Sequence, residues 1–225
     1  MKSRLIVAVL AMIVLSLPAF AQTTADDWFS KGNALFNQSK YNEAIQAYDK
    51  AIELNPQFAL SWNSKGNSFN AQGKRDEAIQ AYDKAIEIDP QYTTAWTNKG
   101  KTLYDQGKYN EALQAYEKAI EINPQSVDAW YGKGNTFSAL GQDNDAIQTY
   151  DKVIQLNPQN VHSWVEKGKV LSKQGKYDEA LQAFNKAIEI DPQNAVAWNG
   201  KGTALQLLNR DLEAEDAFSQ ALFNQ

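Results

Sequence analysis

The chain has 225 residues and a formal net charge of −5, with 27 acidic residues against 22 basic ones and no cysteine. The absence of cysteine excludes disulfide bonds, thiolate metal sites and lipid attachment at an N-terminal cysteine. An acidic chain without a basic cluster is also unsuited to nucleic acid, because phosphate recognition needs clustered Lys and Arg.

Residues 1–21 have the pattern of a signal peptide. Lys2 and Arg4 give a positive start, the stretch from Leu5 to Leu17 is almost entirely apolar, and Ala19-Phe20-Ala21 has the small-x-small form of a cleavage site. The alternative is an uncleaved membrane anchor, although the apolar stretch is shorter than the ~20 residues that a spanning helix needs. We therefore expect cleavage after Ala21 and export from a prokaryotic cytoplasm to the periplasm, the cell surface or the medium.

After this segment, the chain repeats itself every 34 residues, about six times. The repeat is marked by a tryptophan, a glycine four residues later, and a proline that closes each of the first five units. The tryptophans are Trp28, Trp62, Trp96, Trp130, Trp164 and Trp198. The glycines are Gly32, Gly66, Gly100, Gly134, Gly168 and Gly202. A fixed period of this length predicts a stacked solenoid.

The third unit, residues 93–126, shows how each repeat is built. Apolar residues at helical spacing predict a first helix that ends near Gly107, where glycine suits a left-handed helix end. Asn110 is placed to cap a second helix. That helix should end at Asn123-Pro124, because proline disfavours helical geometry at the preceding residue. Each unit is therefore predicted to be a helical hairpin.

Gly100 lies inside the first helix, where glycine costs about 1 kcal/mol relative to alanine. The same cost recurs in all six units, which predicts a close approach of the paired helix. We expect the small Ala112 opposite this glycine, with Trp96 and Tyr116 filling the space on either side. Loss of one such tryptophan would cost roughly 3–5 kcal/mol if it were fully buried.

These marked positions, from Ala25 to the C-terminus, resemble the tetratricopeptide repeat family. The resemblance implies an all-α fold, a right-handed α-solenoid of antiparallel helix pairs whose inner groove is lined mainly by the first helices. The predicted solenoid spans residues 22–225, and its units are 25–58, 59–92, 93–126, 127–160, 161–194 and 195–225.

The sixth unit departs from the others at its outer face. Glu215 stands where the other units have Ile or Leu, as a terminal repeat requires when no further unit covers it. Leu207, Leu208 and Leu212 remain as predicted exposed apolar surface. They suggest contact with a second copy, so a structural, self-associating protein is the alternative to a binding scaffold.

The sequence gives little support for an enzyme, a cofactor, a bound metal or a small-molecule substrate. The single histidine, His162, falls at an exposed repeat position, and no metal-ligand spacing, nucleophile motif or phosphate-binding glycine loop is present. A lysine precedes each repeat glycine: Lys31, Lys65, Lys99, Lys133, Lys167 and Lys201. We expect their stems to cover apolar surface while the ammonium groups reach water, and a row of anion-binding lysines is the alternative.

The free face of the first helices is the predicted functional surface. Asparagine is a poor helix former, yet it recurs there, and its side-chain amide both donates and accepts hydrogen bonds. The predicted groove residues are Asn33, Asn63, Asn67, Asn98, Tyr104, Tyr131, Asn135 and Asn199. In some members of the family that the chain resembles, such an asparagine ladder holds an extended peptide. We therefore expect the partner to be a protein or an extended peptide segment held by its backbone.

A second binding mode of that family grips a C-terminal carboxylate with Lys and Arg on the same face. The corresponding positions here carry Phe29, Ser64, Thr94 and Asn98, and only Asn33 matches. The carboxylate clamp is therefore not expected in this chain.

The export hypothesis predicts the mass of the mature protein. Protein purified from the native host should begin at Gln22, because the small-x-small motif ends at Ala21. Intact-mass measurement checks this directly. A protein that retains Met1 would favour the membrane anchor instead.

Overall fold

The computed structural model describes residues 23–224, so the predicted signal peptide lies outside the described residues. Within this range the chain forms twelve α-helices and no strand. The helices are α2 (Ala25–Asn37), α3 (Tyr41–Leu54), α4 (Ala59–Ala71), α5 (Arg75–Ile88), α6 (Thr93–Asp105), α7 (Tyr109–Ile122), α8 (Val127–Ala139), α9 (Asp143–Leu156), α10 (Val161–Lys173), α11 (Tyr177–Ile190), α12 (Ala195–Leu207) and α13 (Asp211–Phe223). From Thr23 to Asn224, none of these helices combines the length and apolar character needed to span a bilayer.

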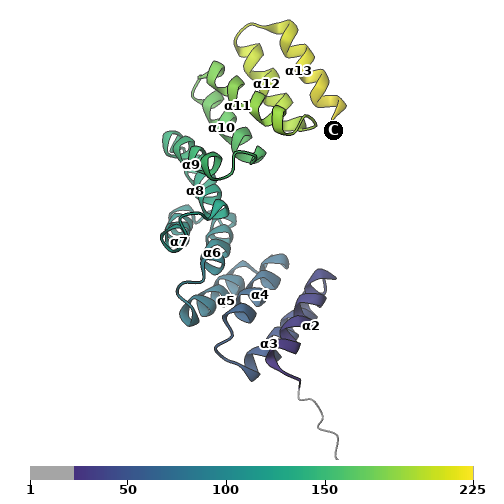
Figure 1. Ribbon diagram of the computed structural model, residues 1–225, viewed down its shortest axis with the longest axis vertical. Coiled ribbons are helices and arrows are strands. Elements are labelled where there is room, and N and C mark those ends of the chain that lie inside the picture. Colours follow the sequence, from purple (N-terminus) through teal and green to yellow (C-terminus); the bar gives the residue numbers. More distant parts are fainter. Residues whose placement is uncertain (1–22, 225) are drawn as a thin grey trace, which may run out of the picture.

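The helices stack in pairs into an open arc (Figure 1). Each helix packs on its neighbours in the sequence, and the first helices of adjacent units also touch one another. Among the described residues, no two second helices are in contact. Because the layer of first helices is the more closely spaced one, it forms the inner side of the arc. The predicted all-α solenoid is confirmed.

Short caps define the ends of the helices. Gly107 has a φ of 74°, which confirms the predicted left-handed helix end. The first and last units use Ser39 and Asn209 at this point, with φ of 60° and 58°. The predicted cap at Asn110 is wrong, because α7 begins one residue earlier, at Tyr109, and its N-cap Lys108 makes no side-chain capping bond.

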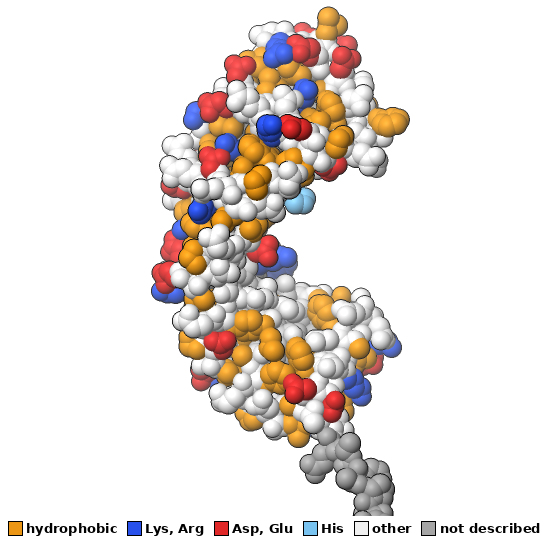
Figure 2. Space-filling model, in the orientation of Figure 1, with side chains coloured by type: hydrophobic (Ala, Val, Ile, Leu, Met, Phe, Trp, Pro, Cys, Tyr) orange, Lys and Arg blue, Asp and Glu red, His pale blue; other side chains and the backbone are white. Residues whose placement is uncertain are grey.

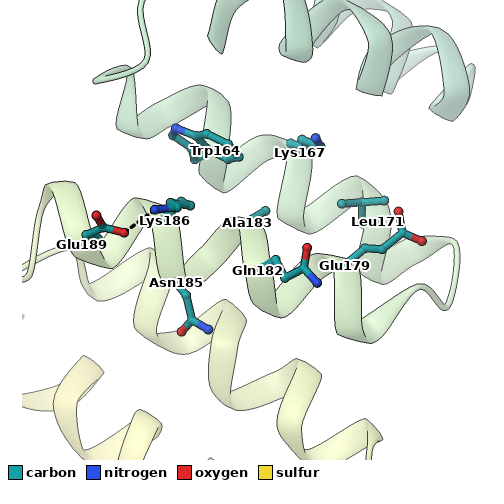
Figure 3. Close-up of a pocket in the computed structure, with 9 residues that line it drawn as sticks. All are labelled: Trp164, Lys167, Leu171, Glu179, Gln182, Ala183, Asn185, Lys186 and Glu189. Atoms are coloured by element: carbon teal, nitrogen blue, oxygen red, sulfur yellow. Dashed lines mark hydrogen bonds and ion pairs between the residues drawn. The ribbon is translucent and has the colours of Figure 1, made fainter. Parts of the chain in front are cut away.

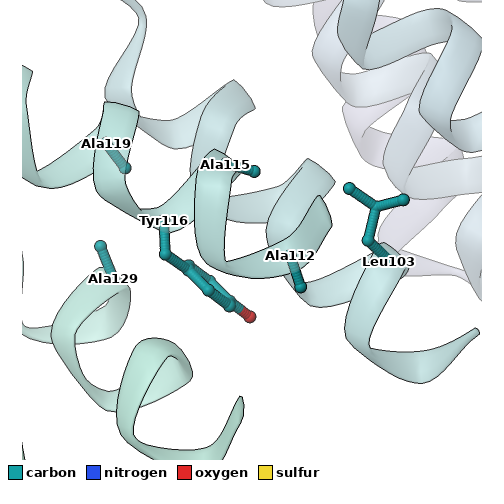
Figure 4. Close-up of a cluster of buried hydrophobic side chains, with 6 residues drawn as sticks. All are labelled: Leu103, Ala112, Ala115, Tyr116, Ala119 and Ala129. Carbon is teal, nitrogen blue, oxygen red and sulfur yellow. The ribbon is translucent and has the colours of Figure 1, made fainter. Parts of the chain in front are cut away.

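The glycine inside each first helix lies against an aromatic ring of the second helix. A Cβ atom added to Gly100 would lie 2.9 Å from Cε1 of Tyr116, so no larger residue fits without a shift. Figure 4 shows the Tyr116 side chain among small alanines of α7 and α8. The closest contact of Gly100 is therefore with Tyr116, and the expectation that Ala112 lies opposite Gly100 stays a prediction. Ala112 is fully buried, but the ring of Tyr116 occupies the close contact.

The repeat tryptophans join one unit to the next. All six are only partly buried, so the cost estimated for a fully buried tryptophan does not apply to them. Four of them donate their indole N–H to the carbonyl oxygen of the proline that closes the preceding unit: Trp96 to Pro90, Trp130 to Pro124, Trp164 to Pro158 and Trp198 to Pro192. These four bonds help to set the angle between each of units three to six and the unit before it.

The row of lysines is largely neutralised. Each lysine ammonium lies over the ring of its own tryptophan, as at Lys99 and Trp96, where it is 5.6 Å from the centroid. Four of them also pair with an acid on the second helix of the preceding unit: Lys65 with Asp49, Lys99 with Asp83, Lys133 with Glu117 and Lys167 with Asp151. Such a row favours the covering role over anion binding.

The last unit is covered on one side only. Leu207 and Leu212 are exposed as predicted, and Leu222 and Phe223 are more than two-thirds exposed. The prediction for Leu208 is wrong, because this side chain packs on the buried cluster of α12 and α13. Among the described residues, α13 packs on α12 alone.

This difference in packing predicts that the helices unfold locally at different rates along the chain. Amide hydrogens of α13 should exchange faster than those of α7, because the α13 backbone is covered on fewer sides and end units of a solenoid open first. Hydrogen exchange followed by mass spectrometry compares the two helices in one experiment. Equal protection of both helices would show that α13 is covered in solution, as a second copy would cover it.

Candidate binding groove

Two kinds of cavity lie against the first helices, and the first kind belongs to the repeat itself. One cavity of about 450 Å³ lies between α10 and α11 and is lined by Trp164, Leu171 and Lys186, among others (Figure 3). A cavity of about 470 Å³ between α6 and α7 has the same lining two periods earlier, with Trp96, Leu103 and Lys118. Because residues at equivalent repeat positions line both cavities, this kind of cavity does not distinguish one unit as a binding site.

The second kind of cavity lies in the middle of the inner layer. We call it the central pocket. It has a volume of about 400 Å³ and is lined by Thr97, Asn98, Lys101, Tyr104, Asp105, Tyr116, Asp128, Tyr131, Gly132 and Asn135. A smaller cavity of about 280 Å³ adjoins it, shares Tyr104, Tyr131 and Asn135, and adds Tyr150 and Glu166. Figure 2 shows the hollow on the inner side of the arc, with charged side chains of both signs near it.

The central pocket is built from positions at which units three and four depart from their neighbours. Tyr104 stands where units two and four have Asn70 and Ser138. Asp105 stands where those units have Ala71 and Ala139. Four of the predicted groove residues, Asn98, Tyr104, Tyr131 and Asn135, line the pocket. These departures make the central pocket the candidate binding site.

The asparagines of the predicted ladder are already partnered on one side. A buried tyrosine of the second helix donates its hydroxyl to each of them at 2.8–2.9 Å: Tyr48 to Asn33, Tyr82 to Asn67 and Tyr150 to Asn135. Oδ1 uses one of its two lone pairs for this bond, so a second lone pair and the amide Nδ2 are left for a ligand. At Asn67 both lone pairs are used, by Tyr82 and Asn98. Asn33 and Asn135 can still both donate and accept toward a peptide.

Two more predicted residues are occupied inside the protein. Asn63 is only 4% exposed, so the prediction that it faces the groove is wrong. Asn98 donates through Nδ2 to Oδ1 of Asn63 at 3.0 Å and to Oδ1 of Asn67 at 3.1 Å. The Oδ1 atom of Asn98 makes no hydrogen bond with the described residues. Asn199 is exposed on α12 and lies outside the central pocket.

Tyr116 has no asparagine partner, unlike the second-helix tyrosines of units one, two and four. Unit three has Lys101 where units one, two and four have the asparagine that receives a tyrosine hydroxyl. Tyr116 is 3% exposed, and its hydroxyl makes no hydrogen bond with the residues described from 23 to 224. It lines the central pocket, where Gly132 leaves room for it: a Cβ at Gly132 would lie 2.6 Å from the Tyr116 hydroxyl oxygen. The pocket therefore contains the hydroxyl of a buried tyrosine, and this hydroxyl is open to a ligand.

The tyrosines of the pocket stay protonated at neutral pH. Burial is the main cause that raises the pKa of Tyr104, Tyr116 and Tyr131, and nearby carboxylates add to it for Tyr104. The Glu166 carboxylate also raises the pKa of Tyr131, and it pairs with Lys169 at 2.7 Å. Each hydroxyl can thus both donate and accept.

Other candidates from the sequence remain outside this pocket. His162 is exposed on α10, with its ring centroid 6.4 Å from that of Tyr131. Phe29, predicted to occupy a clamp position, packs on Phe58 and Tyr48. In the part of the chain that the structure describes, no group of His, Asp and Glu residues is arranged to hold a metal ion.

Several residues of the site are not apparent from the repeat pattern alone. Tyr116 has a core position of the repeat, and sequence reasoning assigned it to packing. Lys101, Asp105 and Gly132 are ordinary helix-surface residues when each is viewed singly. The signal that would have found them is a departure from the repeat at Lys101, exactly one period after Asn67, opposite a tyrosine that keeps its hydroxyl.

Family models for this type of repeat match most of the chain. A model described as a TPR repeat matches residues 66–107, 100–141 and 168–209, about half of the chain. Two models described as a tetratricopeptide repeat match residues 25–58 and 127–160, and residues 47–80 and 149–182. Together the matches run without a gap from residue 25 to residue 209.

Several solved structures are similar to the chain, whereas no curated protein sequence matches it. MamA is 28% identical with a TM-score of 0.67, over 71% of this chain and 93% of MamA. YrrB, described as a TPR protein with an unusual peptide-binding site, is 27% identical with a TM-score of 0.66, over 80% of this chain and 93% of YrrB. PilF of Pseudomonas aeruginosa shares the fold, with 20% identity and a TM-score of 0.76, over 86% of this chain and 88% of PilF.

Because Tyr150 donates to an asparagine and Tyr116 does not, the same substitution should change the free energy of unfolding unequally at the two positions. Tyr150→Phe should destabilise the array by about 0.5–1.5 kcal/mol, because it removes the donor to Asn135. Tyr116→Phe should change stability by less than about 0.5 kcal/mol, because its hydroxyl has no partner to lose. Urea unfolding followed by circular dichroism measures both. Equal costs would contradict the different roles of the two hydroxyls.

Proposed function

This chain belongs to the tetratricopeptide repeat family, and from that premise we propose that it is a non-enzymatic scaffold that binds an extended segment of another protein in its concave groove. The observation that carries the proposal is the central pocket, with its unsatisfied hydrogen-bonding groups between two tyrosine side chains. Such groups match a peptide backbone, which offers one carbonyl and one amide N–H at each residue.

The groups available in the pocket can serve both sides of a peptide bond. Asn135 retains its Nδ2 donor, since Oδ1 accepts from Tyr150. Asn98 retains its Oδ1 acceptor, since Nδ2 donates to Asn63 and Asn67. One peptide carbonyl and one peptide N–H can therefore be bound by two adjacent first helices. Tyr104 and Tyr131 add apolar surface for side chains of the segment.

The likeness to YrrB supports a peptide ligand, since that protein is described as having a peptide-binding site. Binding through a few neutral hydrogen bonds, each contributing about 0.5–1.5 kcal/mol, implies affinities in the micromolar range, or about −8 kcal/mol. We place this activity outside the cytoplasm, on the basis of the predicted signal peptide.

A second function is favoured by one specific observation, the exposed apolar side chains of the last unit. Leu212, Leu222 and Phe223 are 81%, 69% and 87% exposed. Self-association through these residues would make the protein a structural element. Light scattering over a range of protein concentrations separates the two functions, because only self-association raises the mean mass with concentration.

The test of the proposed function uses two asparagines that each accept a hydrogen bond from the buried tyrosine of their own hairpin. A random library of twelve-residue peptides is selected on the immobilised protein, and the best peptide is titrated by calorimetry. Asn135→Ala should weaken binding about three- to tenfold, because Asn135 lines the central pocket. Asn33→Ala removes the equivalent bond to Tyr48 outside the pocket and should leave the affinity unchanged.

Both variants lose one tyrosine–asparagine bond, so general destabilisation affects them alike. Equal loss of affinity in the two variants, or no loss in Asn135→Ala, would place binding elsewhere. Failure to select any peptide would refute the scaffold hypothesis and leave self-association as the better reading.

A further inference from the structure

We propose that the central pocket receives a Lys or Arg side chain of the bound segment. This inference rests on the proposed function, since it assigns a side-chain preference to the same groove. It is carried by three features that meet at one place: two half-buried tyrosines, an excess of carboxylates, and the unpartnered hydroxyl of a buried tyrosine.

The first feature is the pair of aromatic side chains. Tyr104 of α6 and Tyr131 of α8 line both the central pocket and the adjoining cavity, and both are partly buried. Their equivalents in the other units never occur together as tyrosines. Aromatic faces attract ammonium and guanidinium groups, and they also pack on the long aliphatic stems that carry them.

The second feature is the charge of the lining. Asp105 and Asp128 line the central pocket, and Glu166 lines the adjoining cavity. Lys101 is the one cation among the lining residues of the two cavities. Glu166 is held by Lys169, while Asp105 and Asp128 make no ion pair with the residues described. The pocket therefore favours a positive charge over a negative one.

The third feature is the Tyr116 hydroxyl. The Tyr116 side chain is nearly inaccessible and lines the pocket, and unit three lacks the asparagine that receives this hydroxyl in three other units. Its oxygen can accept a hydrogen bond from an ammonium or guanidinium N–H. The free Oδ1 of Asn98 is a second acceptor at the same site.

An apolar or acidic side chain suits this lining less well. An apolar group would cover the Tyr116 hydroxyl and leave it without a partner, which is unfavourable for a buried polar group. An acidic group would face Asp105 and Asp128. A basic side chain satisfies the acceptors, the carboxylates and the aromatic faces together.

The experiment uses matched peptides and the full chain labelled with ¹⁵N. Five acetylated and amidated peptides of sequence Gly-Ser-Gly-Ser-Xaa-Ser-Gly-Ser-Gly carry Arg, Lys, citrulline, Leu or Glu at Xaa. Citrulline has nearly the shape of arginine without its charge. Dissociation constants come from chemical-shift titration, which also locates the site. We expect the Arg and Lys peptides to bind about tenfold more tightly than the others, with shifts around Tyr104 and Tyr131.

Three variants locate the preference. The double variant Asp105→Asn, Asp128→Asn should reduce the advantage of Arg over citrulline to about threefold or less. Tyr116→Phe should weaken the Arg peptide while leaving the fold intact. The matched control Glu77→Gln removes an exposed acid of α5, which lies outside both cavities, and should change nothing.

The outcomes separate this inference from the function on which it rests. If the Leu or citrulline peptide binds as tightly as the Arg peptide, with shifts in the pocket, the basic preference is wrong and the peptide groove stands. If Glu77→Gln lowers the affinity as much as the double variant does, the attraction is general and the pocket assignment is wrong. If no peptide binds at any concentration, both proposals fail.

Discussion

The contact between an aromatic ring of the second helix and the backbone of the first sets the geometry of the whole array. A Cβ atom added to Gly100 would lie 2.9 Å from the Tyr116 ring, and a Cβ added to any of the other five repeat glycines would lie 2.5–2.8 Å from a Tyr or Phe ring. The glycine is unfavourable for helix formation, yet it allows the ring to lie flat in the hairpin. Buried or partly buried rings then hold each pair of helices together, and tryptophan–proline bonds link four of the five successive pairs.

The candidate site arises where this pattern is altered without loss of the fold. In units one, two and four, the second-helix tyrosine is satisfied inside its own hairpin by an asparagine. Unit five has Phe184, which has no hydroxyl to satisfy. Only at Tyr116 among these tyrosines does the hydroxyl remain while its asparagine is replaced, by Lys101. The replacement costs the core little, because the ring still packs on Gly100, and it releases one buried polar group into the groove.

Much of the fold could be predicted from the sequence, because a period repeated six times fixes helix number, helix ends and stacking together. The site was predictable only in part. Asn98, Tyr104, Tyr131 and Asn135 line the pocket as the free helix face suggested, whereas Asn63 lies on the same face but is buried against its neighbours. Helical spacing alone cannot separate these cases, since the superhelix turns each unit relative to the last. The role of Tyr116 depends on the replacement by Lys101 of the asparagine that accepts this hydroxyl in units one, two and four, and helical spacing alone does not reveal that bond.

The unequal contacts of the two helix layers have a mechanical consequence. First helices touch along the whole inner side, whereas second helices of adjacent units do not touch among the described residues. The array should therefore bend most easily about its inner layer, because fewer contacts between units oppose spreading or closing of the outer layer. A ligand bound between α6 and α8 would act at the middle of the arc, where a small change in the angle between units produces the largest displacement of the two ends (Figure 1). The distance between the first and last hairpins is therefore a readout of what the middle of the arc contains.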